Sequence, residues 1–163
     1  MLATSNSHSP TWPVALLLGL VFCLSTVGAA IANTNKCTRA QAIAAEQDAT
    51  DIPDWRTLRH VYGRYRQCDD AAIAEGFSDA VVNLLINKWD DLERDGPGFL
   101  RNRGLRRFIL IHVDILMSEE EFNAIRHRAT SCGTRLKSFC VELNTRLDRV
   151  NDEAREEARS TNK

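Results

Sequence analysis

The chain has 163 residues with 21 basic and 22 acidic side chains, and these charges are unevenly distributed along it. The net charge of −1 excludes a nucleic-acid binder that works by bulk attraction to phosphate. The length fits one domain, because a domain usually contains about 100 to 200 residues. Residues 1 to 32 contain no Asp, Glu, Lys or Arg, so every such side chain lies in residues 33 to 163. The sequence therefore predicts two parts with different roles.

The uncharged part, residues 1 to 32, has the features of a secretory signal peptide. An apolar run over residues 14 to 24 is followed by small residues, and Ala-Ile-Ala at 30 to 32 predicts cleavage before Asn33. No Lys or Arg precedes the run, which departs from the usual signal peptide, so a retained membrane anchor over residues 14 to 32 stays open as the alternative. Cleavage would leave a periplasmic or secreted protein with no membrane span.

Five cysteines are present, and one of them, Cys23, lies in the predicted signal peptide. An exported chain meets an oxidising environment, so the other four predict two disulfides. We favour Cys37 with Cys68 and Cys132 with Cys140, because each bond then joins neighbouring elements; two other pairings stay open. A zinc site is disfavoured, since the chain has no CxxC pair and its spacings match no zinc pattern. We therefore expect no metal and no cofactor.

Apolar residues recur at three- and four-residue intervals along the mature chain, and no alternating strand pattern is found. This periodicity predicts an all-α fold, a compact, disulfide-stapled bundle of five or six helices in a single domain over residues 33 to 150. A charged tail over residues 151 to 163 extends the last helix into solvent or frays. In chain order, the expected helices cover approximately residues 38–48, 54–68, 70–92, 101–116, 118–129 and 134–150.

Capping residues mark where several of these helices begin. Thr38 with Gln41 and Ser118 with Glu121 form capping-box patterns, and Asp54 follows a proline break as an N-cap. Thr134 is expected to cap the last helix in the same way.

Two stretches that contain glycine predict interruptions between these starts. Gly76 to Ser78 is expected to interrupt a long apolar ridge, with Ser78 capping afresh. Asp95 to Gly98 has the sequence Asp-Gly-Pro-Gly, which is the strongest stop signal in the chain.

Known catalytic signatures, such as HExxH, GxSxG and a phosphate-binding glycine loop, are missing. His112 lies on the apolar face of its predicted helix together with Ile115 and Leu116, and we interpret it as a core histidine that donates to a carbonyl. Asp69 and Asp70 could belong to a hydrolase pair, but helix capping explains both without chemistry.

A basic run is the strongest candidate for a contact surface. Arg101, Arg103, Arg106 and Arg107 follow the Gly-Pro-Gly sequence and the neighbouring Phe99, which we expect to be exposed. A loop with an aromatic ring and four arginines suits an acidic protein partner. The competing interpretation is a solvated start of a helix.

The order of these parts resembles the amidase immunity proteins of type VI secretion systems. The resemblance rests on an exported start, a helix ending at Cys68, alanines over residues 71 to 74, and the segment Phe108 to Ile125 with its acidic turn. It implies a periplasmic inhibitor, a homodimer, that plugs a cell-wall amidase with a loop. It transfers no contact residue to this sequence.

Two functions follow from these observations. The first is an inhibitor or immunity protein that blocks a cell-wall-degrading enzyme. The alternative is a small exported enzyme or envelope-stress domain with a site around Asp69, Asp70, Glu75 and His112. The missing catalytic motifs favour the first, so we expect a binding protein and assign no catalytic residue.

Overall fold

Helices make up the regular structure of the part of the chain that the computed structural model describes, residues 36 to 161. No strand occurs in this part, which confirms the all-α prediction. The predicted signal peptide over residues 1 to 32, with Cys23, lies outside the described residues and stays a prediction. No helix within the described range is both long enough and apolar enough to span a bilayer.

The described residues form more helices than the five or six expected. The additional helix arises because the predicted helix over residues 70 to 92 divides at Lys88. In chain order the α-helices are α1 (Arg39–Ala49), α2 (Trp55–Tyr65), α3 (Ala71–Asn87), α4 (Trp89–Phe99), α5 (Arg103–Ile111), α6 (Glu119–Thr130) and α7 (Lys137–Thr161). Two 3₁₀ helices, η1 (Arg66–Cys68) and η2 (Thr134–Leu136), follow α2 and precede α7.

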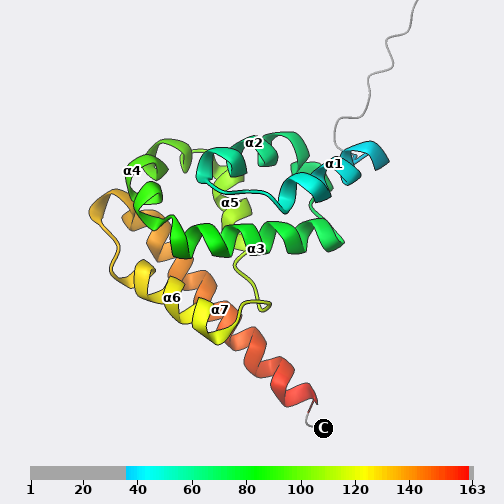
Figure 1. The fold of residues 1–163 in the computed structure, drawn as a ribbon. Coiled ribbons are helices and arrows are strands. Elements are labelled where there is room, and N and C mark those ends of the chain that lie inside the picture. The colour runs from blue at the N-terminus through cyan, green and yellow to red at the C-terminus, as the bar shows by residue number, and fades with distance from the viewer. Residues whose placement is uncertain (1–35, 162–163) are drawn as a thin grey trace, which may run out of the picture. The chain divides into compact units, whose positions relative to one another are not determined.

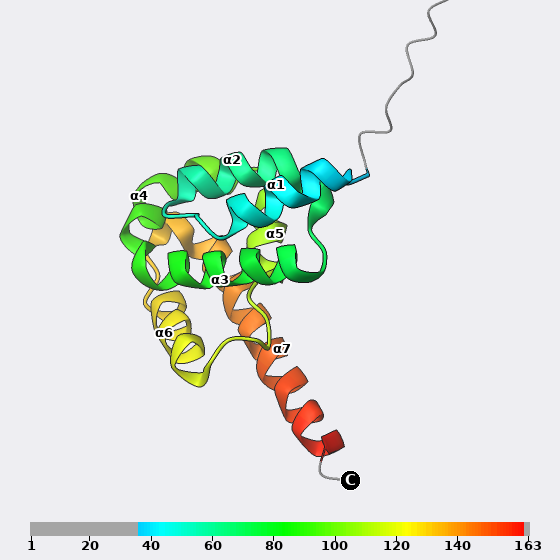
Figure 2. The same ribbon diagram turned by 45° about the vertical axis from the view of Figure 1, so that its right-hand side comes forward.

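Helix α3 is the central element of this arrangement (Figure 1). Helices α1 and α2 pack against each other on one side of α3, and α6 with α7 forms the other side (Figures 1 and 2). Helix α5 packs on α7. The C-terminal end of α7 projects from the body, and its residues 152 to 161 are exposed (Figure 2). The core therefore lies along α3, where Phe77, Leu84 and Leu85 are fully buried.

The predicted caps are confirmed at three helix starts. The Thr38 hydroxyl accepts from the backbone N–H of Gln41, whose side chain accepts in turn from the backbone N–H of Thr38. Ser118 and Glu121 form the same reciprocal pair before α6. Asp54 accepts from Thr57 at 2.7 Å before α2. Thr134 is not a cap, because it lies inside η2.

The stop predicted at Gly96 to Gly98 is wrong, because α4 continues through it to Phe99. Gly96 is buried in close packing: a Cβ atom there would lie 3.0 Å from a methyl of Leu92 and 3.2 Å from one of Leu136. The approach of η2 thus keeps the chain helical where local propensity opposes a helix.

Two further local predictions are also wrong. Helix α3 is continuous through Gly76 to Ser78, and Ser78 is buried rather than capping. Ile115 and Leu116 do not continue a buried stripe, because α5 ends at Ile111 and these two residues lie in the following loop. Their side chains are 42% and 66% exposed.

Candidate functional site

Phe99, expected at the surface, is only 7% exposed. Its ring stacks on Trp55 of α2, with centroids 6.0 Å apart and an interplanar angle of 30°. The guanidinium of Arg59 covers Phe99, with its Cζ 5.4 Å from the ring centroid. The expectation of an exposed aromatic is therefore wrong, because the extension of α4 carries Phe99 beneath α2.

A groove opens where α2 meets the junction of α4 and α5, and we call it the arginine groove. Three arginines and one histidine from α2 and the start of η1 lie along one side of it. It is lined by Arg56, Arg59, His60, Tyr62, Gly63, Arg66, Gly98, Phe99, Asn102 and Leu105. A Cβ atom added at Gly63 or at Gly98 would meet nothing within 4 Å, so these glycines leave open space in the groove.

Two guanidiniums of the arginine groove are held in place by their neighbours. Arg59 lies over Phe99, as described above. Arg66 lies over the ring of Tyr62, with 5.8 Å from Cζ to the centroid, and donates from Nη1 to the carbonyl of Gly63 at 3.2 Å. Stacking on a ring leaves the outer edge of a guanidinium free to donate. These arginines can meet a carboxylate with little further ordering.

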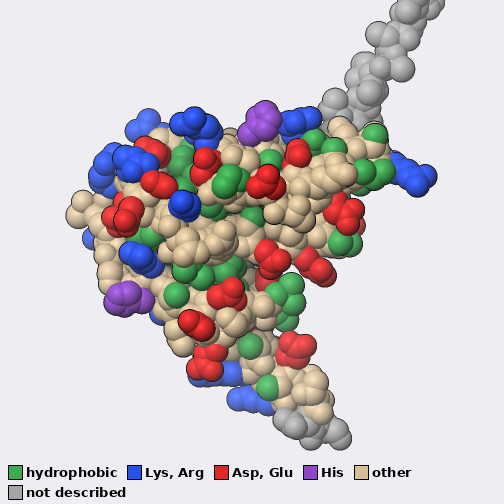
Figure 3. All heavy atoms as spheres, in the orientation of Figure 1, with side chains coloured by type: hydrophobic (Ala, Val, Ile, Leu, Met, Phe, Trp, Pro, Cys, Tyr) green, Lys and Arg blue, Asp and Glu red, His purple; other side chains and the backbone are tan. Residues whose placement is uncertain are grey.

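No ion pair within residues 36 to 161 neutralises the arginines of the groove, although Arg56 interacts electrostatically with the nearby Asp54 and contributes, after the Thr57 hydrogen bonds, to the lowered pKa of that carboxyl. Arg56, Arg59 and Arg66 have no ion pair with any carboxylate in this range. Arg101 and Arg103, which flank the groove residue Asn102, have none there either. On the face shown in Figure 3, basic and acidic side chains are interspersed over α2 and α4. The groove therefore presents a local positive field on a chain whose net charge is −1.

The basic run predicted as one contact surface divides in the structure. Arg101 and Arg103 lie beside the arginine groove, with exposed side chains. Arg106 instead turns to α7, where its Nε donates to the carboxylate of Glu142 at 2.7 Å. Arg107 lines a different groove, between α5 and α7.

Sequence reasoning did not include the arginines of α2 and of the start of η1 in the site. Their spacing contained a usable signal, because Arg56, Arg59, Gly63 and Arg66 follow one another at three- and four-residue intervals. Residues at such intervals share one face of a helix. What the spacing could not reveal is that this face borders the end of α4.

A buried polar cluster joins α3 to the end of α5. His112 is 4% exposed, and its Nδ1 lies 3.1 Å from the hydroxyl of Ser78. Its Nε2 lies 3.2 Å from Oδ1 and 3.3 Å from Oδ2 of Asp69, and the hydrogen-bond geometry is satisfied with Oδ2. His112 is thus a core histidine, but the expectation that it donates to a carbonyl is wrong, since its ring partners are side chains.

The linkage of Asp69, His112 and Ser78 has the order of a carboxylate, a base and a nucleophile. The contacts of these three residues, however, indicate a structural role. The Ser78 hydroxyl is buried and donates its proton to Oδ2 of Asp114 at 2.6 Å, so this proton is not directed at the His112 ring. Asp114 also accepts from the backbone N–H of Leu116 at 2.9 Å. The cluster thereby ties the loop between α5 and α6 to α3.

The other carboxylates considered for chemistry do not join this cluster. Asp70 caps α3 by accepting from Ala71 N–H at 2.9 Å, and Glu75 is exposed. Ala71 has φ 48°, a left-handed conformation that is unusual for a residue with a side chain. Cys68, held by a disulfide, and Asp69, held by His112, precede this turn and fix its entry.

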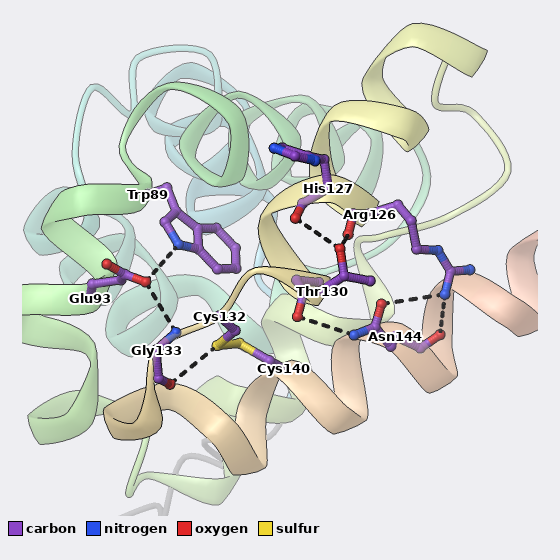
Figure 4. Close-up of a disulfide and its surroundings, with 10 residues drawn as sticks. Trp89, Glu93, Arg126, His127, Thr130, Cys132, Gly133, Cys140 and Asn144 are labelled. Carbon is purple, nitrogen blue, oxygen red and sulfur yellow. Dashed lines mark hydrogen bonds between the residues drawn. A yellow bond between two sulfur atoms is a disulfide. The ribbon is translucent and has the colours of Figure 1, made fainter.

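Both favoured disulfides are confirmed. Cys37 bonds Cys68, with Cα atoms 4.8 Å apart, and joins the segment before α1 to η1. Cys132 bonds Cys140, with Cα atoms 6.4 Å apart, and joins the end of α6 to the start of α7 (Figure 4). The described cysteines are therefore all oxidised, which leaves no thiol nucleophile among them.

Side chains around the second disulfide connect it to α4 and across α7 (Figure 4). Glu93 accepts from the indole N–H of Trp89 at 3.2 Å and from the backbone N–H of Gly133 at 3.4 Å. Asn144 donates to the carbonyl of Ala129 at 3.2 Å. These hydrogen bonds and the disulfide join α4, α6 and α7 at this point.

No group of three or more His, Cys, Asp or Glu side chains in the described range is placed to hold a metal ion. Comparison of the chain with protein-family models, with curated proteins and with solved structures finds no significant match.

Proposed function

We propose that this chain is an exported binding protein of the inhibitor or immunity type, which blocks a cell-wall-degrading enzyme by receiving an acidic segment of that enzyme in the arginine groove. The observation that carries the proposal is the set of held guanidiniums at Arg59 and Arg66 with no carboxylate partner within residues 36 to 161. The amidase effector as the partner class comes from the resemblance in layout described above.

Arginine is suited to this role for physical reasons. A guanidinium can bind a carboxylate through two parallel hydrogen bonds, and such charge-assisted bonds are stronger than neutral ones. The rings of Phe99 and Tyr62 hold two of these groups, so less rotamer freedom is lost on binding. Opposite charges also raise the rate of association, which suits an inhibitor that must act before its target does.

The alternative of a small enzyme rests on the linkage of Asp69, His112 and Ser78. Its support is weaker, because the Ser78 hydroxyl is buried and already donates to Asp114. A nucleophile must reach its substrate, and this one is enclosed by the core. We therefore place recognition, rather than chemistry, first.

The direct experiment is affinity capture of partners from periplasmic extract, with mass spectrometry as the readout. The native chain should retain a secreted wall hydrolase, and the variant Arg59→Glu/Arg66→Glu should lose it. The matched control is Arg155→Glu/Arg159→Glu, which reverses two exposed arginines on the projecting end of α7 and should bind as the native chain does.

A second measurement separates the choice of surface from the function. The purified chain should inhibit the captured enzyme on isolated cell wall, and the groove variant should not. Inhibition that survives both groove substitutions would move the contact to another surface. Capture of no wall hydrolase by the native chain would overturn the proposed function itself.

A further inference from the structure

A second groove lies between α5 and α7 and shares no residue with the arginine groove. It encloses about 430 Å³, which is within the range of small-molecule sites. Helix α5 contributes Arg107, Leu110 and Ile111, and α7 contributes Glu142, Thr145, Arg146 and Arg149.

The charges in this groove are partly neutralised, and the pattern leaves two cations. Glu142 is paired with Arg106, which approaches it from outside the groove. Arg146 is paired with Glu153 at 3.1 Å. Arg107 and Arg149 have no carboxylate partner within residues 36 to 161. One exposed guanidinium from each helix is therefore available to an anion.

The groove also has an apolar surface, which comes from α5. Ile111 is 48% exposed, although it is a large aliphatic residue on the last turn of α5. Leu110 beside it is half-buried. An aliphatic chain lying on these two side chains would remove apolar surface from water, worth about 25 cal/mol per Å².

We propose that the groove between α5 and α7 binds an aliphatic carboxylate, a molecule of the fatty-acid class. Its carboxylate is shared by the guanidiniums of Arg107 and Arg149, and its hydrocarbon chain lies on Leu110 and Ile111. Two observations support this assignment: the positive charge of the two arginines, which complements a carboxylate, and the exposed side chain of Ile111.

A peptide fits the same groove less well. A bound peptide brings amide groups that need hydrogen-bond partners. Both walls of the groove are helices, and most of their backbone amides and carbonyls bond within the helix, the last carbonyls of α5 excepted. The hydroxyl of Thr145 donates to the carbonyl of Val141 at 2.9 Å and is already engaged as a donor. A ligand without amides, with charge at one end, matches the groups that the groove offers.

The test is a titration of the ¹⁵N-labelled full chain with decanoate below its micelle concentration, followed by amide chemical shifts. The shifts should concentrate on α5 and α7 around Ile111. Arg107→Gln/Arg149→Gln should weaken decanoate binding about tenfold or more, because the charge-assisted hydrogen bonds from both guanidiniums to the carboxylate are lost. Ile111→Ser should bring the affinity for decanoate close to that for acetate.

Controls separate this site from general surface binding. Arg155→Gln/Arg159→Gln alters two exposed arginines on the same helix and should bind decanoate as the native chain does. Decyltrimethylammonium, with the same chain and the opposite charge, should not produce the shifts. Circular dichroism of each variant should match the native spectrum, since all these side chains lie at the surface.

Several results would overturn the assignment. These are unchanged binding in Arg107→Gln/Arg149→Gln, shifts centred on the arginine groove, equal affinity for acetate and decanoate, and tighter binding of the peptide acid acetyl-Ala-Ala-Leu than of decanoate. None of them bears on the proposed inhibitor function, because that function is tested through Arg59 and Arg66.

Discussion

Arginine side chains play different parts in two regions of the molecule. In the arginine groove, Arg59 and Arg66 rest on aromatic rings, and no carboxylate within residues 36 to 161 neutralises them. At the seam where α7 packs on α5 and α6, Arg106, Arg126 and Arg146 each form an ion pair with a carboxylate of α7. We call this second region the α7 seam.

The seam arginines also satisfy groups that burial would otherwise leave unpaired. Arg146 donates from Nε to the carbonyl of Val113 at 2.8 Å, and Arg126 donates to the side chain of Asn144 at 3.3 Å. These contacts join α7 to the loop after α5 and to α6. Arginine therefore supports the fold in the α7 seam and is available for recognition in the arginine groove. The side chains that surround each arginine determine this difference.

The largest expected effect on stability comes from His112, which follows the last residue of α5. Both the arginine groove and the α7 seam contain residues of this helix. His112→Leu should lower the free energy of unfolding by about 3 kcal/mol, since it leaves the Asp69 carboxylate and the Ser78 hydroxyl without their ring partner in the core. Urea unfolding measures it, with the exposed His60→Leu as the control. A loss below about 1 kcal/mol would mean that the cluster adds little.

Arg146→Met tests the α7 seam. We expect a loss of about 1 to 2 kcal/mol, because the buried carbonyl of Val113 loses its donor and the ion pair with Glu153 disappears. Partner binding at the arginine groove should stay unchanged. Arg149→Met, on the same helix and without an ion pair in the described range, should change stability by less than about 0.5 kcal/mol. Equal losses in the two variants would contradict the distinction.

Asp54→Ala tests the helix that presents the arginine groove. The backbone N–H of Thr57 donates to the Asp54 carboxylate and, with the Thr57 side chain, lowers the pKa of this group. A lowered folded-state pKa stabilises the fold above the unfolded value of about 3.9, and this contribution is lost as the pH falls through the folded value. The cap as a whole contributes about 1 kcal/mol at neutral pH.

The Asp54→Ala variant should therefore differ most from the native chain at neutral pH and approach it in acid. Thermal unfolding between pH 2 and pH 7 measures this difference. Asp51→Ala, an exposed neighbour whose side chain caps no helix, should show no such convergence. A difference that is constant with pH would exclude the carboxylate as the source.

The smallest expected effect on stability comes from the arginine groove itself. Arg59→Ala/Arg66→Ala should lower the free energy of unfolding by no more than about 1 kcal/mol, because neither side chain forms an ion pair within the described range and each exposed cation–π contact that is lost contributes about 0.5 kcal/mol. Binding of the captured partner should nevertheless weaken by tenfold or more. A large loss of stability would show that the groove arginines act as the seam arginines do.

Local features of the fold were readable from the sequence because each depends on residues close together in the chain. The capping boxes at Thr38 and Ser118 and the cap at Asp54 provide hydrogen-bond acceptors for backbone N–H groups within three residues. The disulfide pairing followed from joining neighbouring elements. The same local rules failed at Gly96, where contact with η2 outweighs a Gly-Pro-Gly sequence.

The residues of the candidate site could be predicted only in part from the sequence. Arg101 and Arg103 were identified, but Phe99 was expected outside and Arg106 was expected to be free. Both errors concern contacts between helices far apart in sequence: Phe99 meets Trp55 across α2 and α4, and Arg106 meets α7. Helical periodicity predicts the helix face on which a residue lies. It does not predict which other helix packs on that face.

The sequence by itself determined a helical chain and the starts of three of its capped helices, because these depend on hydrogen bonds and periodicity along the chain, and it favoured the disulfide pairing that the structure contains. Only the tertiary structure decided which arginines meet a carboxylate and which remain available. That difference depends on distances between α2, α4, α5 and α7, which no local pattern encodes, and it separates the scaffold from the surface proposed to bind.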